Sequence, residues 1–227
     1  MIEEAIRRFL GCELHEVSTL EKLGPCSSDQ EFPVTLHVDG RIYLAGFLLS
    51  RSEHNRRRNH GLGAVTSTGL LHALWELPNG LAFPNSSLRE IDRHTLGRQG
   101  HGWIEQRNDD VIRKYQPPGT VSSIFVADRS LARAINKAAI HPDTVMRTAI
   151  WVNQPQGGTK RQSEMLLGAN ELGVGVLQVG TGYLRQLVQP ANPKLGRPSV
   201  FRWWHAELAY RNWLSKGAPT ARAESLA

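Results

Sequence analysis

The sequence predicts an α/β protein with a central mixed sheet flanked by helices, and three observations carry this prediction. Residues 120–180 alternate between β-rich and helical segments, which implies crossovers within a parallel or mixed sheet. Residues 34–49 hold two β-rich runs joined by Asp-Gly, a strong hairpin signal. A chain of 227 residues that is 40% hydrophobic can bury one sizeable core. We therefore expect a single domain over residues 1–214 and a disordered tail over 215–227.

The elements of the first half follow from hydrophobic periodicity and turn chemistry. A helix over 66–77 begins at a capping residue, Thr66 or Ser67, and ends before Pro-Asn-Gly. Residues 84–120 are polar and charged at both signs, and "GWIEQ" is their one candidate strand. The elements expected before residue 84 are a helix over 2–10, a hairpin pairing 34–38 with 41–49, and the helix over 66–77.

The second half carries the alternating pattern and closes with an aromatic helix. A glycine after "SEMLLGANEL" ends one of the helices, as is common at helix C-termini. The expected strands cover 120–128, 144–154 and 174–180, and the expected helices cover 129–140, 163–173 and 199–214.

Charge and cysteine content limit the function classes. The chain has 27 Lys plus Arg against 21 Asp plus Glu, a net charge of +6. Such a balance favours nucleic-acid contact, although arginine-rich codon usage is an alternative cause. No apolar run approaches the roughly 18 residues that a membrane span needs. Cys12 and Cys26 alone supply neither a disulfide framework nor a zinc knuckle, so we expect a cytoplasmic protein without a membrane partner.

The densest cationic stretch is "SRSEHNRRRNHG", residues 50–61. Arginine forms planar, bidentate contacts with phosphates and guanine edges, so this stretch predicts binding to double-stranded DNA. The alternative is a solvated loop. A second basic loop, "GGTKRQ", offers a possible phosphate contact. The expected nucleic-acid contacts are Arg51, Arg56, Arg57, Arg58, His60, Lys160 and Arg161.

A candidate catalytic group lies between residues 92 and 107. Asp92 stands thirteen residues before Glu105, and Arg107 follows two residues later. In a strand, alternation puts Glu105 and Arg107 on the same face. Asp92 and Glu105 could then hold Mg²⁺ for phosphodiester hydrolysis, with Arg107 supporting the developing charge. The alternative is an exposed segment of mixed charge.

This acid, then acid-x-base arrangement resembles the motif of the PD-(D/E)XK, restriction-endonuclease-like nucleases, with Arg107 in the place of the motif's lysine. The resemblance implies a restriction-endonuclease-like fold and a magnesium-dependent type II endonuclease that acts as a homodimer. If the strand over 120–128 is the equivalent one, Asp128 is its only carboxylate, and the protein binds without cutting. Residues 34–60 are also similar to the start of GIY-YIG nucleases, with Tyr43 and Gly46 in the motif. A non-catalytic nucleic-acid-binding protein, such as a regulator or accessory subunit, is the alternative function.

Overall fold

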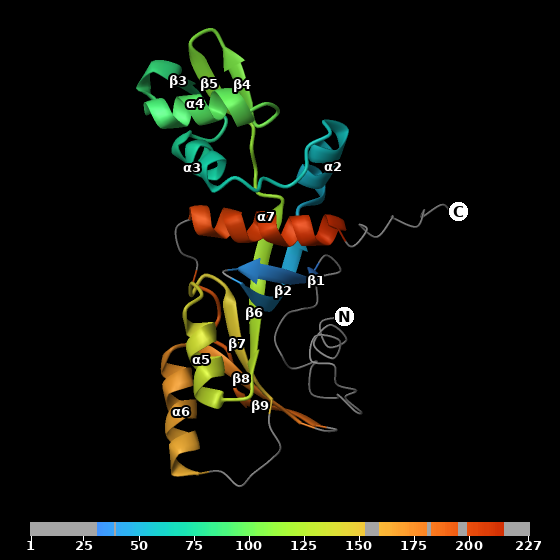
Figure 1. The fold of residues 1–227 in the computed structure, drawn as a ribbon, viewed down its shortest axis with the longest axis vertical. Helices are drawn as coiled ribbons and strands as arrows, with labels where there is room; N and C mark the ends of the chain where they lie inside the picture. Colours follow the sequence, from blue (N-terminus) through green and yellow to red (C-terminus); the bar gives the residue numbers. More distant parts are fainter. Residues whose placement is uncertain (1–30, 39, 153–158, 181–182, 195–198, 216–227) are drawn as a thin grey trace, which may run out of the picture. The chain divides into compact units, whose positions relative to one another are not determined.

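A computed structural model describes residues 31–38, 40–152, 159–180, 183–194 and 199–215 (Figure 1). These residues belong to two compact units, one within Met1–Leu48 and Val121–Arg197 and the other within Leu49–Thr120 and Pro198–Ala227. We call them unit 1 and unit 2. The helix expected over 2–10 and both cysteines lie outside the described residues, as does the tail beyond residue 215.

Unit 1 is built on a six-stranded mixed sheet in the order β1-β2-β6-β7-β8-β9. The central strands β6, β7 and β8 run parallel, whereas β1 pairs antiparallel with β2 and β9 antiparallel with β8. Its elements are β1 (Glu31–Val38), β2 (Arg41–Leu49), β6 (Gly119–Asp128), α5 (Leu131–Ala139), β7 (Met146–Val152), α6 (Lys160–Glu171), β8 (Val174–Gly180) and β9 (Tyr183–Val188).

The two crossover helices of unit 1 lie side by side, α5 along β7 and α6 along β8 (Figure 1). Ser130 caps α5, and its buried side chains Leu131, Ala134, Ile135 and Ala138 recur at helical spacing. The strands contribute fully buried residues, such as Ile150. Both faces of the parallel strands are buried, which explains why their sequences are nearly continuous apolar runs.

Unit 2 joins helices to a small antiparallel sheet in the order β3-β5-β4. Leucines of α3 and α4 pack with Trp103, Tyr115 and Trp203 in one hydrophobic core. Its elements are α2 (Arg51–Asn59), α3 (Thr68–Glu76), β3 (Ala82–Pro84), the 3-10 helix η2 (Asn85–Ser87), α4 (Glu90–Gln99), β4 (Ile104–Arg107), β5 (Asp110–Arg113) and α7 (Val200–Ser215).

The α/β class, the mixed sheet and its flanking helices are confirmed. The Asp-Gly hairpin forms as β1 and β2, and Ser67 is the capping residue of α3. The structure differs in making residues 51–59 a helix, in placing α4, β3 and β5 in the polar stretch after residue 81, and in adding β9. Helix α6 also begins at Lys160, three residues earlier than expected, because Thr159 and Gln162 form a capping box. A restriction-endonuclease-like fold and a single domain over 1–214 stay predictions.

Within the described ranges, no helix combines the length and the apolar character that crossing a bilayer requires.

Candidate functional site

The arginine-rich stretch folds as α2, and its three consecutive arginines point in different directions. An α-helix turns by about 100° per residue, so neighbouring side chains diverge. Arg57 is completely buried, Arg58 is exposed, and the side chain of Arg56 is 27% exposed. The stretch is therefore not a uniformly solvated cationic loop.

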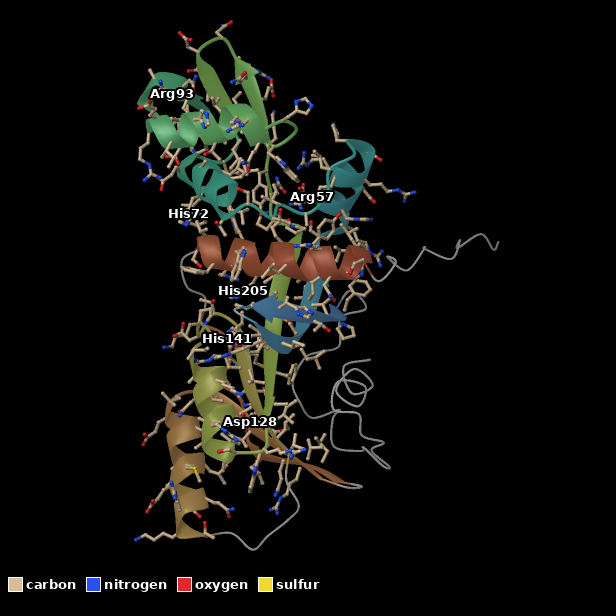
Figure 2. All side chains as sticks on the ribbon, viewed as in Figure 1. Arg57, His72, Arg93, Asp128, His141 and His205 are labelled. Atoms are coloured by element: carbon tan, nitrogen blue, oxygen red, sulfur yellow. The ribbon has the colours of Figure 1, made fainter. Side chains whose placement is uncertain are left out.

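Arg57, labelled in Figure 2, lies at the centre of a buried hydrogen-bond network in unit 2. Its two terminal nitrogens donate to both carboxylate oxygens of Glu207, at 2.9 and 2.7 Å. Its Nε donates to Glu53 at 2.8 Å, and the backbone carbonyls of Gly63 and Gln116 accept further bonds. This fork-to-fork pairing with a carboxylate is the geometry for which arginine is best suited.

The partner carboxylate of Glu207 is equally well satisfied. It also accepts from the backbone N–H of Val65 and from the hydroxyl of Tyr115, each at 2.8 Å. Burial alone would lower the pKa of Arg57, but the hydrogen bonds and charge of Glu207 outweigh burial and raise it. Burial, reinforced by the charge of Glu207, likewise raises the pKa of Tyr115. The ring of Trp103 lies 4.6 Å from the guanidinium carbon of Arg57, which adds a cation–π contact.

This network corrects one expected nucleic-acid contact. With 0% exposure, the guanidinium of Arg57 cannot reach a phosphate at the surface. It instead holds α2 to α7 and to the chain around Gly63 and Gln116. Arg57 and Glu207 are 150 residues apart in the sequence, so the sequence alone could not show that they pair.

The other basic residues of α2 remain accessible. Arg51, Arg58 and His60 are exposed. Arg56 pairs with Glu53 at 2.7 Å and donates to the carbonyl of Gly102 at 3.3 Å, which fixes its guanidinium beside the start of β4. These four side chains are available for contacts with an anion.

The second basic segment belongs to unit 1. Lys160 and Arg161 are exposed in the first turn of α6, directly after the capping residue Thr159. Residues 160–162 of the expected loop are thus the beginning of a helix. The phosphate contact expected at Lys160 and Arg161 stays a prediction.

The two candidate metal ligands are each paired with cations close to them in sequence. Asp92 is buried on α4 and accepts from Arg89 at 2.6 Å. Glu105 on β4 accepts from Arg107, as strand alternation predicted, and from Lys114 at 2.6 Å. Hydrogen bonds from Lys114 and Arg107 lower the pKa of Glu105.

In the part of the chain that the structure describes, no three His, Cys, Asp or Glu side chains gather where they could hold a metal ion. Among the described contacts, Asp92 and Glu105 pair with different cations, and no third acidic side chain contacts either of them. The magnesium site therefore stays a prediction, and we derive no chemical step through it.

Asp128, the other candidate carboxylate, lies at the end of β6 in unit 1. Lys137 donates to it at 2.7 Å and the backbone N–H of Ser130 at 2.8 Å, so it anchors the start of α5. These two hydrogen bonds outweigh burial and lower the pKa of Asp128.

Sequence reasoning missed helix α4, whose outer face carries residues suited to recognition. Asp92 and Leu96, one turn apart, are its buried positions. Ile91, His94 and Arg98 recur at helical spacing on the exposed side, and Ile91 is 70% exposed. The signal was weak because a helix with two buried residues lacks a clear apolar stripe.

No protein-family model, curated protein or solved structure matches this chain. The candidate site therefore rests on the geometry of its own residues.

Proposed function

We propose that the protein binds double-stranded DNA through unit 2, with α4 as the helix that enters the major groove. The observation that carries the proposal is the order and pairing of the elements α3, β3, η2, α4, β4 and β5. The 3-10 helix η2 and α4 are separated by Leu88 and Arg89, and α4 packs on α3. A hairpin follows, whose second strand pairs with β3. This arrangement resembles a helix-turn-helix with an appended hairpin, or winged form.

The outer face of α4 has the chemistry for direct readout of base pairs. An α-helix fits the major groove of B-DNA, where arginine pairs with guanine and apolar groups contact the thymine methyl. Arg98 supplies a guanidinium, His94 a polar ring and Ile91 an apolar surface. Ile91 is 70% exposed, so its apolar side chain is accessible for contact with a thymine methyl group.

Flanking residues offer contacts with the DNA backbone. Arg107, 66% exposed, lies at the turn of the β4–β5 hairpin, where Asn108 adopts a positive φ of 53°. Arg93 donates to the carbonyls of Asn85 and Leu88, which ties α4 to the helical turn before it. Phosphate contacts position such a domain, and base contacts give it specificity.

The test is a binding selection from random duplexes, followed by fluorescence anisotropy on the selected site. Arg98→Gln should weaken specific binding by about 5- to 150-fold, the scale of one bidentate base contact worth roughly 1–3 kcal/mol. It should leave binding to unrelated duplexes nearly unchanged. Arg129→Gln, which removes an exposed arginine from unit 1, is the matched control and should bind as the wild type does. Failure to select any duplex would overturn the proposal.

Hydrolysis of the bound DNA, as in a type II restriction-like endonuclease, stays a separate prediction that rests on the spacing of Asp92 and Glu105. Incubating the protein with supercoiled plasmid and magnesium, against an EDTA control, tests it directly. Cleavage that EDTA abolishes would support the nuclease, and intact plasmid with every divalent metal would favour the non-catalytic DNA-binding protein. The expected homodimer and cytoplasmic location also stay predictions, and analytical ultracentrifugation checks the first.

A further inference from the structure

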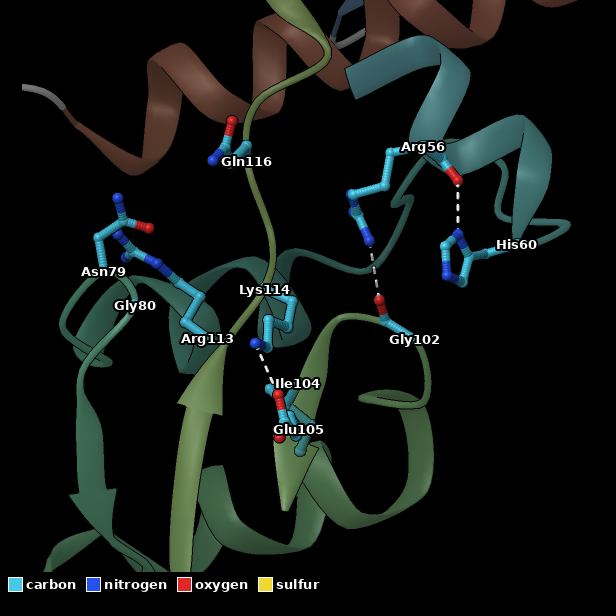
Figure 3. Close-up of a pocket in the computed structure, with 10 residues that line it drawn as sticks. All are labelled: Arg56, His60, Asn79, Gly80, Gly102, Ile104, Glu105, Arg113, Lys114 and Gln116. Carbon is cyan, nitrogen blue, oxygen red and sulfur yellow. Dashed lines mark hydrogen bonds and ion pairs between the residues drawn. The ribbon is translucent and has the colours of Figure 1, made fainter. Parts of the chain in front are cut away.

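A concave pocket of about 560 Å³ lies within unit 2, apart from the outer face of α4 (Figure 3). Arg56 of α2 and His60, the residue after that helix, line one side, and Arg113 of β5 and the following Lys114 line another. Among the described residues that line it, Glu105 is the one acidic residue. The volume falls within the range of about 300–1,000 Å³ that is usual for small-molecule sites.

The pocket carries an excess of positive charge. Glu105 is shared by Arg107 and Lys114, and Glu53 is shared by Arg56 and the buried Arg57, which also pairs with Glu207. Among the residues that the structure describes, two of the positive charges therefore have no acidic counterpart. The lining groups and their ion-pair partners comprise five cations (Arg56, Arg57, Arg107, Arg113 and Lys114) and three carboxylates (Glu53, Glu105 and Glu207).

Arg113 is the cation whose charge is least compensated. None of the ion pairs among the described residues includes it, and its buried Nε has no hydrogen-bond partner there. One terminal nitrogen donates to the carbonyl of Leu74 at 3.1 Å, and its guanidinium carbon lies 5.0 Å from the ring of Trp203. Burial lowers the pKa of Arg113, as expected for a partly buried cation that lacks a carboxylate. Buried charges are usually paired, so an anion from outside the chain would complete this site.

We propose that the pocket binds a phosphate group through the three cations that line it, Lys114 between Arg113 on one side and Arg56 on the other (Figure 3). A phosphate dianion matches the excess of two positive charges, and its several oxygens can accept from two guanidinium groups and an ammonium at once. Lys114 would exchange the surface carboxylate of Glu105 for the ligand, which costs little because exposed ion pairs are weak. The pocket does not depend on the DNA-binding proposal, since none of its lining residues belongs to α4.

The phosphate could belong to a small metabolite or to a DNA terminus, and one set of titrations distinguishes them. Inorganic phosphate is titrated into the isotopically labelled protein at constant ionic strength, with chloride as the reference anion, and amide NMR shifts are followed. We expect saturable shifts at Gly80, Gly102 and Lys114. The second arm compares a duplex bearing a 5′-phosphate with the same duplex bearing a 5′-hydroxyl. Preference for the phosphorylated duplex indicates a DNA end, and equal affinity alongside phosphate binding indicates a small molecule.

Variants decide whether the pocket is the site. Arg113→Gln should weaken phosphate binding by at least tenfold, the scale of one charge-assisted hydrogen bond to a buried group, about 1.5–3 kcal/mol. Since Arg113 also supports the core, Lys114→Gln serves as a second variant, and a loss of about three- to fivefold is expected for this more exposed charge. Lys194→Gln is the matched control, because Lys194 forms a comparable surface ion pair with Asp143 in unit 1. The absence of saturable shifts at the pocket, or equal affinity in wild type and Lys114→Gln, would overturn the proposal.

Discussion

Replacing Arg57 by methionine should destabilise unit 2 strongly, even though a residue in the most basic stretch of the chain would be expected to lie at the surface. The substitution keeps an apolar stem but leaves Glu207, which is 1% exposed, without the one cation that pairs with it among the described residues. Glu53, 2% exposed, keeps its ion pair with Arg56. Removing one partner of a buried ion pair typically costs about 3–5 kcal/mol because the remaining charge is uncompensated. For a protein of this size that corresponds to a fall in Tm of roughly 6–20 °C.

Urea unfolding followed by tryptophan fluorescence measures this effect, since Trp103 and Trp203 lie in the same core as the network. Arg58→Met is the control, because it makes the same chemical change one residue further on at an exposed position. The double variant Arg57→Met with Glu207→Gln should be less destabilised than the sum of its single variants, because the orphaned charge is removed. If Arg57→Met unfolds at the same urea concentration as Arg58→Met, the network does not stabilise the fold.

Four further predictions test other parts of the structure. Gly175→Ala should destabilise by about 1–3 kcal/mol in chemical denaturation, because a Cβ there would lie 2.7 Å from the ring of Pro190. Gly168→Ala, in α6 with no atom within 4 Å of the new Cβ, should instead stabilise by about 0.5–1 kcal/mol. Burial lowers the pKa of His205, so stability should fall as the pH drops below about 6.5, where the unfolded state takes up a proton first. His205→Gln should reduce that slope in melts between pH 5 and 8, and an unchanged slope would contradict the assignment. Glu105→Gln should leave DNA binding intact or tighter, and it should lower plasmid cleavage about a hundredfold if the predicted nuclease activity exists.

Elements whose stability comes from local patterns could be predicted from the sequence. The strands of unit 1 are long apolar or alternating runs, and the hairpin carries its turn signal at Gly40, where φ is +70°. Helices α3 and α5 each begin at a serine that caps them and bury an apolar stripe. In these segments the propensity, the capping residue and the burial pattern all favour the same structure.

Elements that depend on distant contacts could not be predicted. Helix α2 has two buried residues, both charged, so its hydrophobic pattern gave no helix signal. It is stabilised by the bonds between Arg57 and Glu207, which only the folded chain brings together. Helix α4 likewise buries only Asp92 and Leu96, and the strands around it are three or four residues long. Short, polar elements of this kind become stable through a shared core rather than through their own sequence.

The candidate site shows why a count of charges does not locate a binding surface. Three consecutive arginines of α2 differ in what they do, because each is turned by about 100° from the one before. Arg56 lines the pocket, Arg57 pairs with two buried carboxylates, and Arg58 is exposed to solvent. In contrast, the partly buried Arg113 lies outside the basic stretch and has no carboxylate partner among the described residues. The positive charge that remains available to bind an anion therefore depends on which carboxylates the fold places beside each arginine. The density of basic residues in the sequence favoured Arg57 as an anion contact, whereas the geometry of the folded chain favours Arg113.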